Sequence, residues 1–388
     1  MLSEISITGY RSIRQLRLPL RRVTVVVGAN GTGKTNLYRA IALLQGAASG
    51  SLARDIAAEG GMDSVFWAGG RKTGSAPLEE EAGNWVHSVR KDQSHRIAIA
   101  ARFDRDEGLD YSLELGAPIP GRGLPGEAVV KSEQVAMAGG KRSVTLLDRK
   151  ASGLRVRGIE GRWEEPGLEL LGSETALSMV AASHPQIANL RQAMLQWRFY
   201  QGFRTDPASP LRKPSASASA THLDADGGNL AAVFATLAWI REDTRALDAA
   251  IDQAFPGAKL EIGGDADGLR IALRYRDYPF RPFSVAELSD GTLQFLALAG
   301  ALLSYRPPPL LVLNEPEASL HPDIVPAIGA MVAEAARTSQ IIVVTHSTIL
   351  ADAIAEATGA RPMRLLRDGN GTEVEGYNAL MGRFDDED

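Results

Sequence analysis

The sequence predicts an α/β protein in which a mostly parallel sheet is flanked by helices. Three observations lead to this prediction. The run Val23–Val27 is nearly all β-branched, and a glycine-rich loop and a helical pattern follow it. Two further apolar runs, 310–313 and 341–344, also alternate with helical patterns. Short apolar runs are typical of strands covered on both faces, and covered strands that alternate with helices indicate a parallel sheet.

The composition is that of an ordinary globular protein and excludes several kinds of site. The chain has 388 residues, 44% of them hydrophobic and 23% charged, which fits one large domain or two. It has no cysteine, so disulfides, thiolate zinc sites and cysteine nucleophiles are excluded. No apolar run approaches the roughly 18 residues that span a bilayer, and the N-terminus lacks the pattern of a secretion signal. We therefore expect a cytoplasmic protein with no membrane partner.

The beginning of the chain predicts strands, then a loop and a helix. Residues 1–27 include Leu16, Leu18 and Leu20, which alternate with polar residues as on a half-buried strand. In the helix after the loop, Gly46 stands where the helix is expected to end. The apolar face of that helix would be formed by Leu37, Ile41 and Leu44.

The middle of the chain is predicted to hold a β-rich insertion at about 94–165, where strand-like stretches lie between turns. Residues 172–200 return to a helical pattern that ends in an aromatic stretch. The segment 207–226 is interpreted as a loop because of its prolines and serines, and 228–254 predicts one or two amphipathic helices. There is no internal repeat and no long heptad pattern.

The end of the chain alternates helices with strands and completes a division into two domains. A helix is expected from Ser289 through Leu303, and another from about 322 to 336. Residues 1–205 would form a first lobe with the glycine-rich loop, an antiparallel β subdomain and the β-rich, partly helical insertion. Residues 206–388 would form a helical linker and a second lobe.

The glycine-rich loop at 28–35 matches the pattern G-x-x-x-x-G-K-[ST] between a strand and a helix, the context that a phosphate-binding loop requires. Glycines let backbone N–H groups converge on phosphates, and the helix N-terminus adds partial positive charge. Lys34 is expected to reach the β- and γ-phosphates, and the Thr35 hydroxyl to bind Mg²⁺. The loop therefore predicts a P-loop NTPase that uses ATP and Mg²⁺. Its nucleotide-binding residues would be Asn30, Gly31, Thr32, Gly33, Lys34, Thr35 and Asn36.

The strand at 310–313 ends in Asn314 and Glu315. Ligands of parallel sheets bind at the carboxyl ends of the strands, so this pair should lie near the phosphates. Glu315 stands where a carboxylate can orient and deprotonate the attacking water. His346, at the end of the next strand, would contact the γ-phosphate. We therefore predict Glu315, His346 and Lys34 as the catalytic residues.

A second anion site is predicted where Ser289 and Gly291 open a helix. A serine, a glycine and a free helix N-terminus together suit a phosphate. Alone this pattern is weak, because many helices begin with serine. Its position just before a strand that ends in Asn-Glu-Pro-Glu makes it stronger.

In this order, the motifs resemble the ABC-type ATPase heads of the RecF/SMC class, and imply a stand-alone ATPase of that kind. The matching pieces are ITGYRSIRQLRLPL and RRVTVVVGANGTGKTNLYRAI at the start, and AELSDGTLQFLALAGALL, PPPLLVLNEPEASLHPD and IIVVTHS later. The resemblance covers about residues 1–45 and 284–350, and covers the middle poorly.

The resemblance implies a homodimer in which two chains sandwich two ATP molecules. Ser289 and Gly291 would then cap the γ-phosphate held by the partner's loop, and 317–321 would lie on the dimer seam. It further implies that Gln201 senses Mg²⁺ and the attacking water, and that Arg11 contacts the nucleotide. The alternative for Arg11 is a solvated charge at the end of a strand.

The chain also departs from its resemblance. The helical arm of SMC proteins would need hundreds of residues of heptads, which are absent. About forty residues follow His346, too few for the nuclease domain of the related overcoming-lysogenisation-defect proteins, so we expect no nuclease. A membrane-transporter ATPase also fits poorly, because the phosphate loop and the signature at Ser289 are too far apart in sequence.

Three hypotheses about function remain open. The first is a DNA-associated ATPase in repair or genome defence, whose basic residues would contact phosphates. The second is a nucleotide switch that controls a separately encoded effector protein without binding DNA, which the net charge of −5 favours slightly. The third is a relic without turnover, for which only Asn314 argues. The basic residues of the first hypothesis are Lys141, Arg142, Arg149, Lys150, Arg155 and Arg157 in the insertion, and Arg204, Arg212 and Lys213 around the serine-rich loop.

Asn314 predicts a slow ATPase that needs elevated Mg²⁺. Most nucleotide hydrolases have aspartate here to hold a Mg²⁺-bound water. Asparagine keeps an acceptor oxygen but loses the charge, which should weaken Mg²⁺ retention by about 1–2 kcal/mol. Asn314→Asp should therefore lower the Mg²⁺ concentration for half-maximal ATP hydrolysis. A Mg²⁺ titration at saturating ATP checks this, and an unchanged Mg²⁺ dependence would contradict our account of Asn314.

Overall fold

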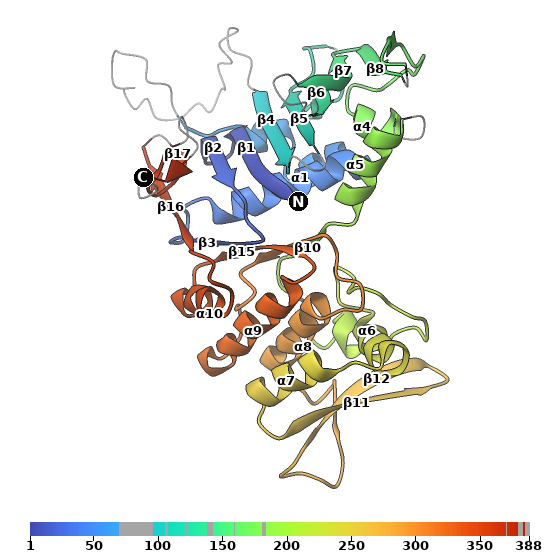
Figure 1. Ribbon diagram of the computed structural model, residues 1–388, viewed down its shortest axis with the longest axis vertical. Coiled ribbons are helices and arrows are strands. Elements are labelled where there is room, and N and C mark those ends of the chain that lie inside the picture. The colour runs from blue at the N-terminus through green and yellow to red at the C-terminus, as the bar shows by residue number, and fades with distance from the viewer. Residues whose placement is uncertain are drawn as a thin grey trace, which may run out of the picture.

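The computed structural model shows two halves of the molecule stacked on one central sheet (Figure 1). The first strands and the β-rich middle of the chain lie above this sheet in the view, and most of the later helices lie below it. The structure describes residues 1–69, 96–104, 108–121, 123–137, 143–158, 160–180, 184–369, 371–378 and 383–384.

The central sheet has six strands. They are β3 (Val23–Val27), β10 (Arg198–Tyr200), β14 (Leu310–Asn314), β15 (Gln340–Thr345), β16 (Met363–Asp368) and β17 (Gly371–Val374). Their order is β10-β14-β15-β3-β16-β17; the first five run parallel, and β17 is antiparallel to β16. The three covered strands that the sequence predicts therefore lie side by side in this sheet.

The larger sheet has eight strands and forms the upper half. They are β1 (Leu2–Tyr10), β2 (Ile13–Pro19), β4 (Arg96–Phe103), β5 (Leu109–Gly116), β6 (Val129–Met137), β7 (Val144–Lys150), β8 (Gly153–Arg157) and β9 (Trp163–Glu164). All neighbouring pairs are antiparallel, because most of its strands follow one another through short connections. The predicted mostly parallel sheet is thus the central one, and the largest sheet is antiparallel, which the sequence analysis predicted only for a subdomain. The β-rich segment continues the N-terminal sheet, since β4 pairs with β1.

Helix α1 (Lys34–Ser49) packs between the two sheets, and its predicted apolar face is fully buried in their shared core. The helix does not end at Gly46, as the sequence analysis expected, but at Gly50, whose φ is 82°. Gly46 lies inside the helix, where a β-carbon would come 2.5 Å from Oδ2 of Asp55 and 3.4 Å from the Cα of Leu52, so glycine allows α2 to approach closely. The other helices of this half are α2 (Leu52–Ala58), α3 (Met62–Val65), α4 (Ala176–Val180) and α5 (Pro185–Leu195).

The lower half contains most of the remaining helices and a small sheet. The helical segments after β10 are η2 (Pro210–Arg212), α6 (Leu230–Thr236), the π-helical turn η3 (Leu237–Arg241), α7 (Arg245–Ala254), α8 (Asp290–Leu302), η4 (Pro322–Ile324), α9 (Val325–Ala335) and α10 (Thr348–Thr358). The small sheet, which the sequence analysis did not predict, is β11 (Ala258–Asp265), β12 (Gly268–Tyr275) and β13 (Phe283–Ser284). A short pair, β18 (Tyr377–Asn378) and β19 (Arg383–Phe384), follows β17. The division at residue 205 stays a prediction.

The central sheet is apolar on both faces because alternate residues of its strands enter two different cores. Val312 and Ile342 lie in the core that contains α1, while Leu311 and Val343 lie in the core that contains α8, α9 and α10. Each fully buried side chain of this kind contributes about 1.5–3 kcal/mol. Burial on both faces holds the sheet rigidly, and so the residues at its edges have defined positions.

A buried charged cluster joins the antiparallel sheet to α4. The carboxylate of Glu133 is fully buried and accepts hydrogen bonds from the N–H groups of Ala176 (2.6 Å) and Leu177 (2.9 Å) and the hydroxyl of Tyr111 (3.0 Å). Arg149 lies 3.9 Å from the carboxylate. Burial raises the pKa of Glu133, and these hydrogen bonds oppose the shift.

Glu133→Ala should lower the free energy of unfolding by about 3 kcal/mol, because it leaves the buried Arg149 charge without its carboxylate. Urea unfolding followed by circular dichroism measures the change. The matched control is Glu114→Ala, which removes an exposed carboxylate 2.7 Å from Arg96 and should cost less than about 1 kcal/mol. Equal losses in the two variants would contradict a structural role for the buried cluster.

Candidate functional site

The carboxyl ends of four neighbouring strands meet at one edge of the central sheet. The register of β10, β14, β15 and β3 aligns their last residues. The residues that leave these strands therefore emerge side by side, and they are Gln201, Glu315, His346 and Gly28. The structure thus brings together sequence-predicted residues from distant parts of the chain.

The glycine-rich loop folds around the side chain of Lys34. Its ammonium donates to the carbonyls of Gly28 (2.7 Å) and Ala29 (2.9 Å). Gly31 and Gly33 have φ values of 82° and 101°, in the left-handed region that favours glycine. A β-carbon on Gly33 would lie 2.3 Å from the hydroxyl oxygen of Thr372, so glycine is required there for space as well.

The N-terminus of α1 is prepared to receive an anion. No side chain caps it, and its first turn has no acidic residue, so its N–H groups keep their hydrogen-bonding capacity and partial positive charge. Lys34 is 4% exposed. Burial lowers the pKa of its ammonium, and the nearby carboxylates of Glu315 and Glu317 oppose that shift. An incoming phosphate would meet the ammonium and the helix N-terminus together.

A hydrogen-bonded brace, which the sequence analysis missed, supports the loop. The hydroxyl of Thr372 donates to the carbonyl of Thr32 at 2.8 Å and lies 2.9 Å from the hydroxyl of Ser12. Asn36, predicted to bind nucleotide, donates to the same Ser12 oxygen at 2.9 Å. Ser12 follows Tyr10 and Arg11 in the motif at the start of the chain. Thr372 belongs to the other end of the chain, so no local sequence pattern marks it.

Glu315 and His346 face one another across the sheet edge. Glu315 has a φ of 50°, and its N–H donates to the carbonyl of Val344 at 2.7 Å. Nδ1 of His346 lies 3.5 Å from Oε1 of Glu315 and 3.4 Å from Oε1 of Glu317. A non-glycine residue at positive φ is strained, and such strain concentrates at functional sites. The catalytic roles of Glu315, His346 and Lys34 stay predictions.

The residues predicted to hold Mg²⁺ present oxygen atoms suited to it. Asn314 is 5% exposed, and its Oδ1 is buried without a hydrogen-bond partner in the described part of the chain. Buried polar atoms normally have a partner, so this atom suits a site completed by a ligand. Gln201 follows β10 beside it, and Thr35 is the second residue of α1. Amide, hydroxyl and phosphate oxygens are hard donors that Mg²⁺ accepts, and the metal roles stay predictions.

The predicted second anion site opens α8. The hydroxyl of Ser289 accepts from the N–H of Thr292 at 3.2 Å and caps the helix. A β-carbon on Gly291 would lie 3.0 Å from the carbonyl oxygen of Ser319, so the helix start packs against the segment 317–321. Ser289 forms hydrogen bonds with Thr292 and Leu293, both in this first turn. The predicted contact with a partner's phosphate stays a prediction.

Arg11 lines a hollow of about 280 Å³ next to the phosphate loop. Its guanidinium pairs with Glu59 at 2.8 Å, and its φ is 49°. Asn36 and Trp67 line the same hollow. The guanidinium of Arg14 lies 5.5 Å from the ring centroid of Trp67, so both the indole and Arg11 already have partners within the chain. The contact between Arg11 and nucleotide stays a prediction.

Several basic residues proposed for DNA are engaged inside the protein. Arg149 is 1% exposed and belongs to the buried cluster with Glu133, so it is not part of a surface patch. The guanidinium of Arg155 pairs with Asp148 at 2.7 Å, and that of Arg157 lies 4.7 Å from the ring centroid of Trp163. Lys150 is exposed, and Lys141 and Arg142 lie outside the described residues.

Arg212 also makes structural contacts within the chain, which were not expected from the sequence. Its guanidinium donates to the carbonyls of Val285 (2.6 Å) and Leu288 (3.2 Å) and to the carboxylate of Asp290 (2.9 Å). It therefore holds the segment that leads into α8, because three acceptors converge on one side chain. Arg204 pairs instead with Asp206, and Lys213 is exposed.

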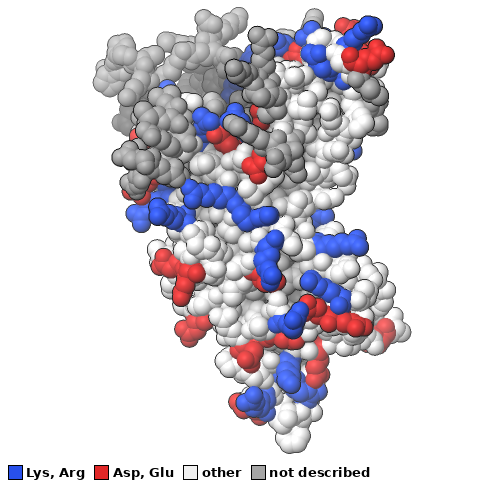
Figure 2. Space-filling model, viewed as in Figure 1, with Lys and Arg blue, Asp and Glu red and all other residues white. Residues whose placement is uncertain are grey.

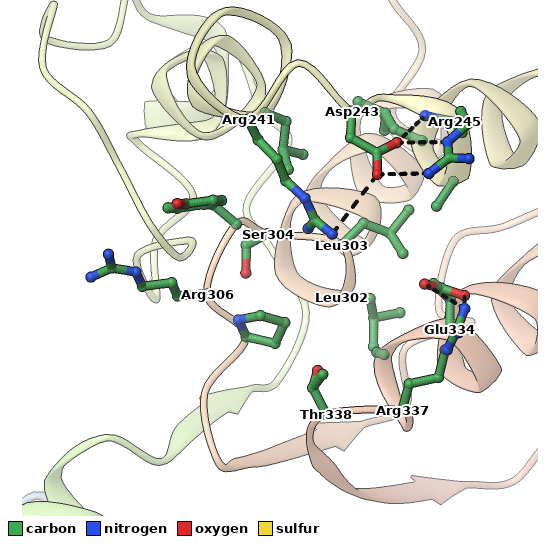
Figure 3. Close-up of a pocket in the computed structure, with 16 residues that line it drawn as sticks. Arg241, Asp243, Arg245, Leu302, Leu303, Ser304, Arg306, Glu334, Arg337 and Thr338 are labelled. Carbon is green, nitrogen blue, oxygen red and sulfur yellow. Dashed lines mark hydrogen bonds and ion pairs between the residues drawn. The ribbon is translucent and has the colours of Figure 1, made fainter.

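A further hollow lies away from these residues (Figure 3). Its volume is about 940 Å³, and it lies at the amino ends of β14 and β15, opposite the phosphate loop. Its arginines largely face acids, since Arg245 lies 3.0 Å from Asp243 and Arg337 lies 3.2 Å from Glu334. The hollow contains none of the predicted site residues.

Two family models match the chain. One, described as "AAA ATPase domain", matches residues 1–196, about half of the chain. The other, described as "AAA domain, putative AbiEii toxin, Type IV TA system", matches residues 213–352. The chain belongs to the AAA ATPase domain family. No protein of the curated set matches it. In the described part of the chain, no helix combines the length and apolar character that crossing a bilayer requires.

The fold is that of SMC head domains. The crystal structure of the SmcHead bound to the C-winged helix domain of ScpA matches with a TM-score of 0.53 and 14% identity, over 98% of this chain and 99% of the other. The Smc head domain with an extended coiled coil bound to the C-terminal domain of ScpA, derived from Pyrococcus furiosus, matches with a TM-score of 0.50 and 14% identity, over 96% and 95%. The resemblance to an SMC-type ATPase head is therefore confirmed at the level of fold.

Thr372→Val should weaken nucleotide binding about fivefold to tenfold, because each hydrogen bond of the brace contributes about 1–1.5 kcal/mol. A titration with a fluorescent ATP analogue measures the affinity. The matched control is Thr24→Val, which removes a buried hydroxyl bonded to Arg21 at the opposite end of β3. Equal affinities of the two variants would contradict a role of the brace in holding the loop.

Proposed function

We propose that the chain is a Mg²⁺-dependent ATPase of ABC type that dimerises around ATP. The observation that carries the proposal is the meeting of the phosphate loop, Glu315 and His346 at one edge of the central sheet. A cation, a carboxylate and an imidazole at the end of parallel strands are the groups that phosphoryl transfer to water requires. The family and the fold of the chain support the same conclusion.

In the proposed reaction, each residue of the site has a separate task. Lys34 leaves the carbonyls of its own loop and binds the β- and γ-phosphates, together with the N–H groups of α1. Glu315 orients a water molecule and accepts its proton as the water oxygen attacks the γ-phosphorus and the bond to ADP breaks. His346 contacts the γ-phosphate. Mg²⁺ supplies neutralisation of charge on the phosphate oxygens, and Thr35, Gln201 and Asn314 would hold it.

The dimer follows from the position of the second anion site. Ser289 and Gly291 open α8 in the half of the molecule that does not contain the loop. We propose that they bind the γ-phosphate held by the second chain, with 317–321 on the seam. Hydrolysis would then remove the group that joins the chains, so ATP closes the dimer and its cleavage opens it.

Glu315→Gln should reduce ATP hydrolysis at least about 100-fold, because it removes the proton acceptor. Steady-state phosphate release with Mg²⁺, with and without double-stranded DNA, measures this. Turnover in the variant equal to that of the unaltered chain would contradict the role of Glu315.

The same Glu315→Gln chain should dimerise with ATP in analytical ultracentrifugation, and adding Ser289→Arg should leave it monomeric. Ser217→Arg, on the exposed serine-rich loop, is the matched control and should still dimerise. A Ser289→Arg chain that dimerises normally with ATP would contradict the proposed sandwich.

DNA in repair or genome defence remains our first proposal for what the dimer acts on. On the face in Figure 2, basic side chains predominate across the waist, while basic and acidic side chains interleave below it. Arg21, Arg22 and Arg337 line a hollow of about 440 Å³, where Arg337 is also paired with Glu334 at 3.2 Å. Such charges suit phosphate contacts that weaken with salt.

A second candidate is a switch that controls a separately encoded effector protein. The observation that favours it is the burial of Arg149 and the pairing of Arg155 and Arg212 with acids of the same chain, which leaves fewer of the proposed basic residues for DNA. DNA-stimulated hydrolysis in the assay above favours the first proposal. Hydrolysis without any DNA binding at low salt favours the second.

A further inference from the structure

Glu317 occupies a place that no role in the proposed reaction explains. It lies two residues beyond Glu315, in a turn closed by the N–H of Ala318 donating to the carbonyl of Glu315 at 3.0 Å. Its side chain is 8% exposed, whereas that of Glu315 is 34% exposed. The turn therefore directs one acid toward solvent and the other into the protein.

One oxygen of Glu317 is anchored over the end of β15. Oε1 accepts from the hydroxyl of Thr345 at 2.5 Å and lies 3.4 Å from Nδ1 of His346. Because β15 lies between β14 and β3, the carboxylate sits between the end of the Asn314 strand and the phosphate loop. Glu317 also opposes the lowering of the Lys34 pKa by burial, which places its charge within electrostatic reach of that ammonium.

The other oxygen of Glu317 is unused. Oε2 is buried and has no hydrogen-bond partner in the described part of the chain, and the same is true of Oδ1 of Asn314, three residues earlier. A buried carboxylate is costly unless it is paired, hydrogen-bonded or near a metal. Two unpartnered oxygens at one sheet edge, one neutral and one anionic, indicate a place for a cation and its water.

We propose that Glu317 supplies the negative charge that Asn314 lacks, by accepting a hydrogen bond from a Mg²⁺-bound water in the nucleotide site. Glu317 is thus a positioning residue for the metal, and this inference rests on the proposed function. A carboxylate at either position 314 or position 317 could accept the hydrogen bond from this water. An aspartate at 314 would add a second carboxylate for the same water, so it should improve Mg²⁺ retention less while Glu317 is present than when Glu317 is removed.

The inference is tested with Mn²⁺ as the probe and a non-hydrolysable ATP analogue, by the electron paramagnetic resonance signal of free Mn²⁺. Glu317→Gln should weaken Mn²⁺ retention about tenfold or more, the range for partners of metal ligands. Binding of the fluorescent analogue without metal, in EDTA, should stay unchanged. Glu356→Gln, an exposed acid on α10, is the matched control and should retain Mn²⁺ normally.

The double variant Asn314→Asp with Glu317→Gln decides between this role and a purely structural one. It should restore Mn²⁺ retention to within about threefold of the unaltered chain, because either carboxylate can hold the water. Asn314→Asp should therefore improve retention more in the Glu317→Gln chain than alone. If Glu317→Gln reduces Mn²⁺ retention equally with asparagine or aspartate at 314, the inference is overturned. Glu317 would then only support Thr345 and His346.

The outcome separates this inference from the proposed function. Unchanged Mn²⁺ retention in Glu317→Gln, in a chain that hydrolyses ATP, overturns the inference alone. No hydrolysis by the unaltered chain, with Mn²⁺ retention that still depends on Glu317, overturns the ATPase proposal and leaves the metal role standing.

Discussion

The parallel hydrogen-bonded register of β10, β14, β15 and β3 is the constraint on which the site depends. In parallel strands, residues at the same register leave the sheet at the same edge. The phosphate loop precedes the Asn-Glu pair and His346 by hundreds of residues in sequence, and the register alone makes them neighbours. Burial of both faces of the sheet fixes that register, because a slip of one residue would exchange the two cores.

Two segments far apart in sequence support the loop through hydrogen bonds. Ser12 belongs to the turn of the antiparallel sheet, and Thr372 to a strand at the end of the chain, yet both contact the segment around Gly33. On the other side, Arg212 joins the chain after β10 to the start of α8.

The charges at the sheet edge show why an asparagine at 314 is compatible with a metal site. The cation of Lys34 lies within electrostatic reach of two carboxylates, one from Glu315 and one from Glu317. A charge missing at residue 314 can be supplied by residue 317 only if the chain turns between them, as it does after Glu315. Motif patterns score each position separately, and so they register the loss at 314 but not the buried acid at 317.

The sequence by itself determined the glycine-rich loop, the presence of Glu315 and His346 at the strand ends and the helix that Ser289 caps. These features are local, because glycine conformation, apolar runs and a capping serine act within a few residues. Only the tertiary structure decided that the largest sheet is antiparallel, that Arg149 and Arg212 lie within the protein, and that Thr372 supports the loop. Strand pairing, burial and contacts over hundreds of residues depend on how the whole chain packs, and no local pattern encodes them.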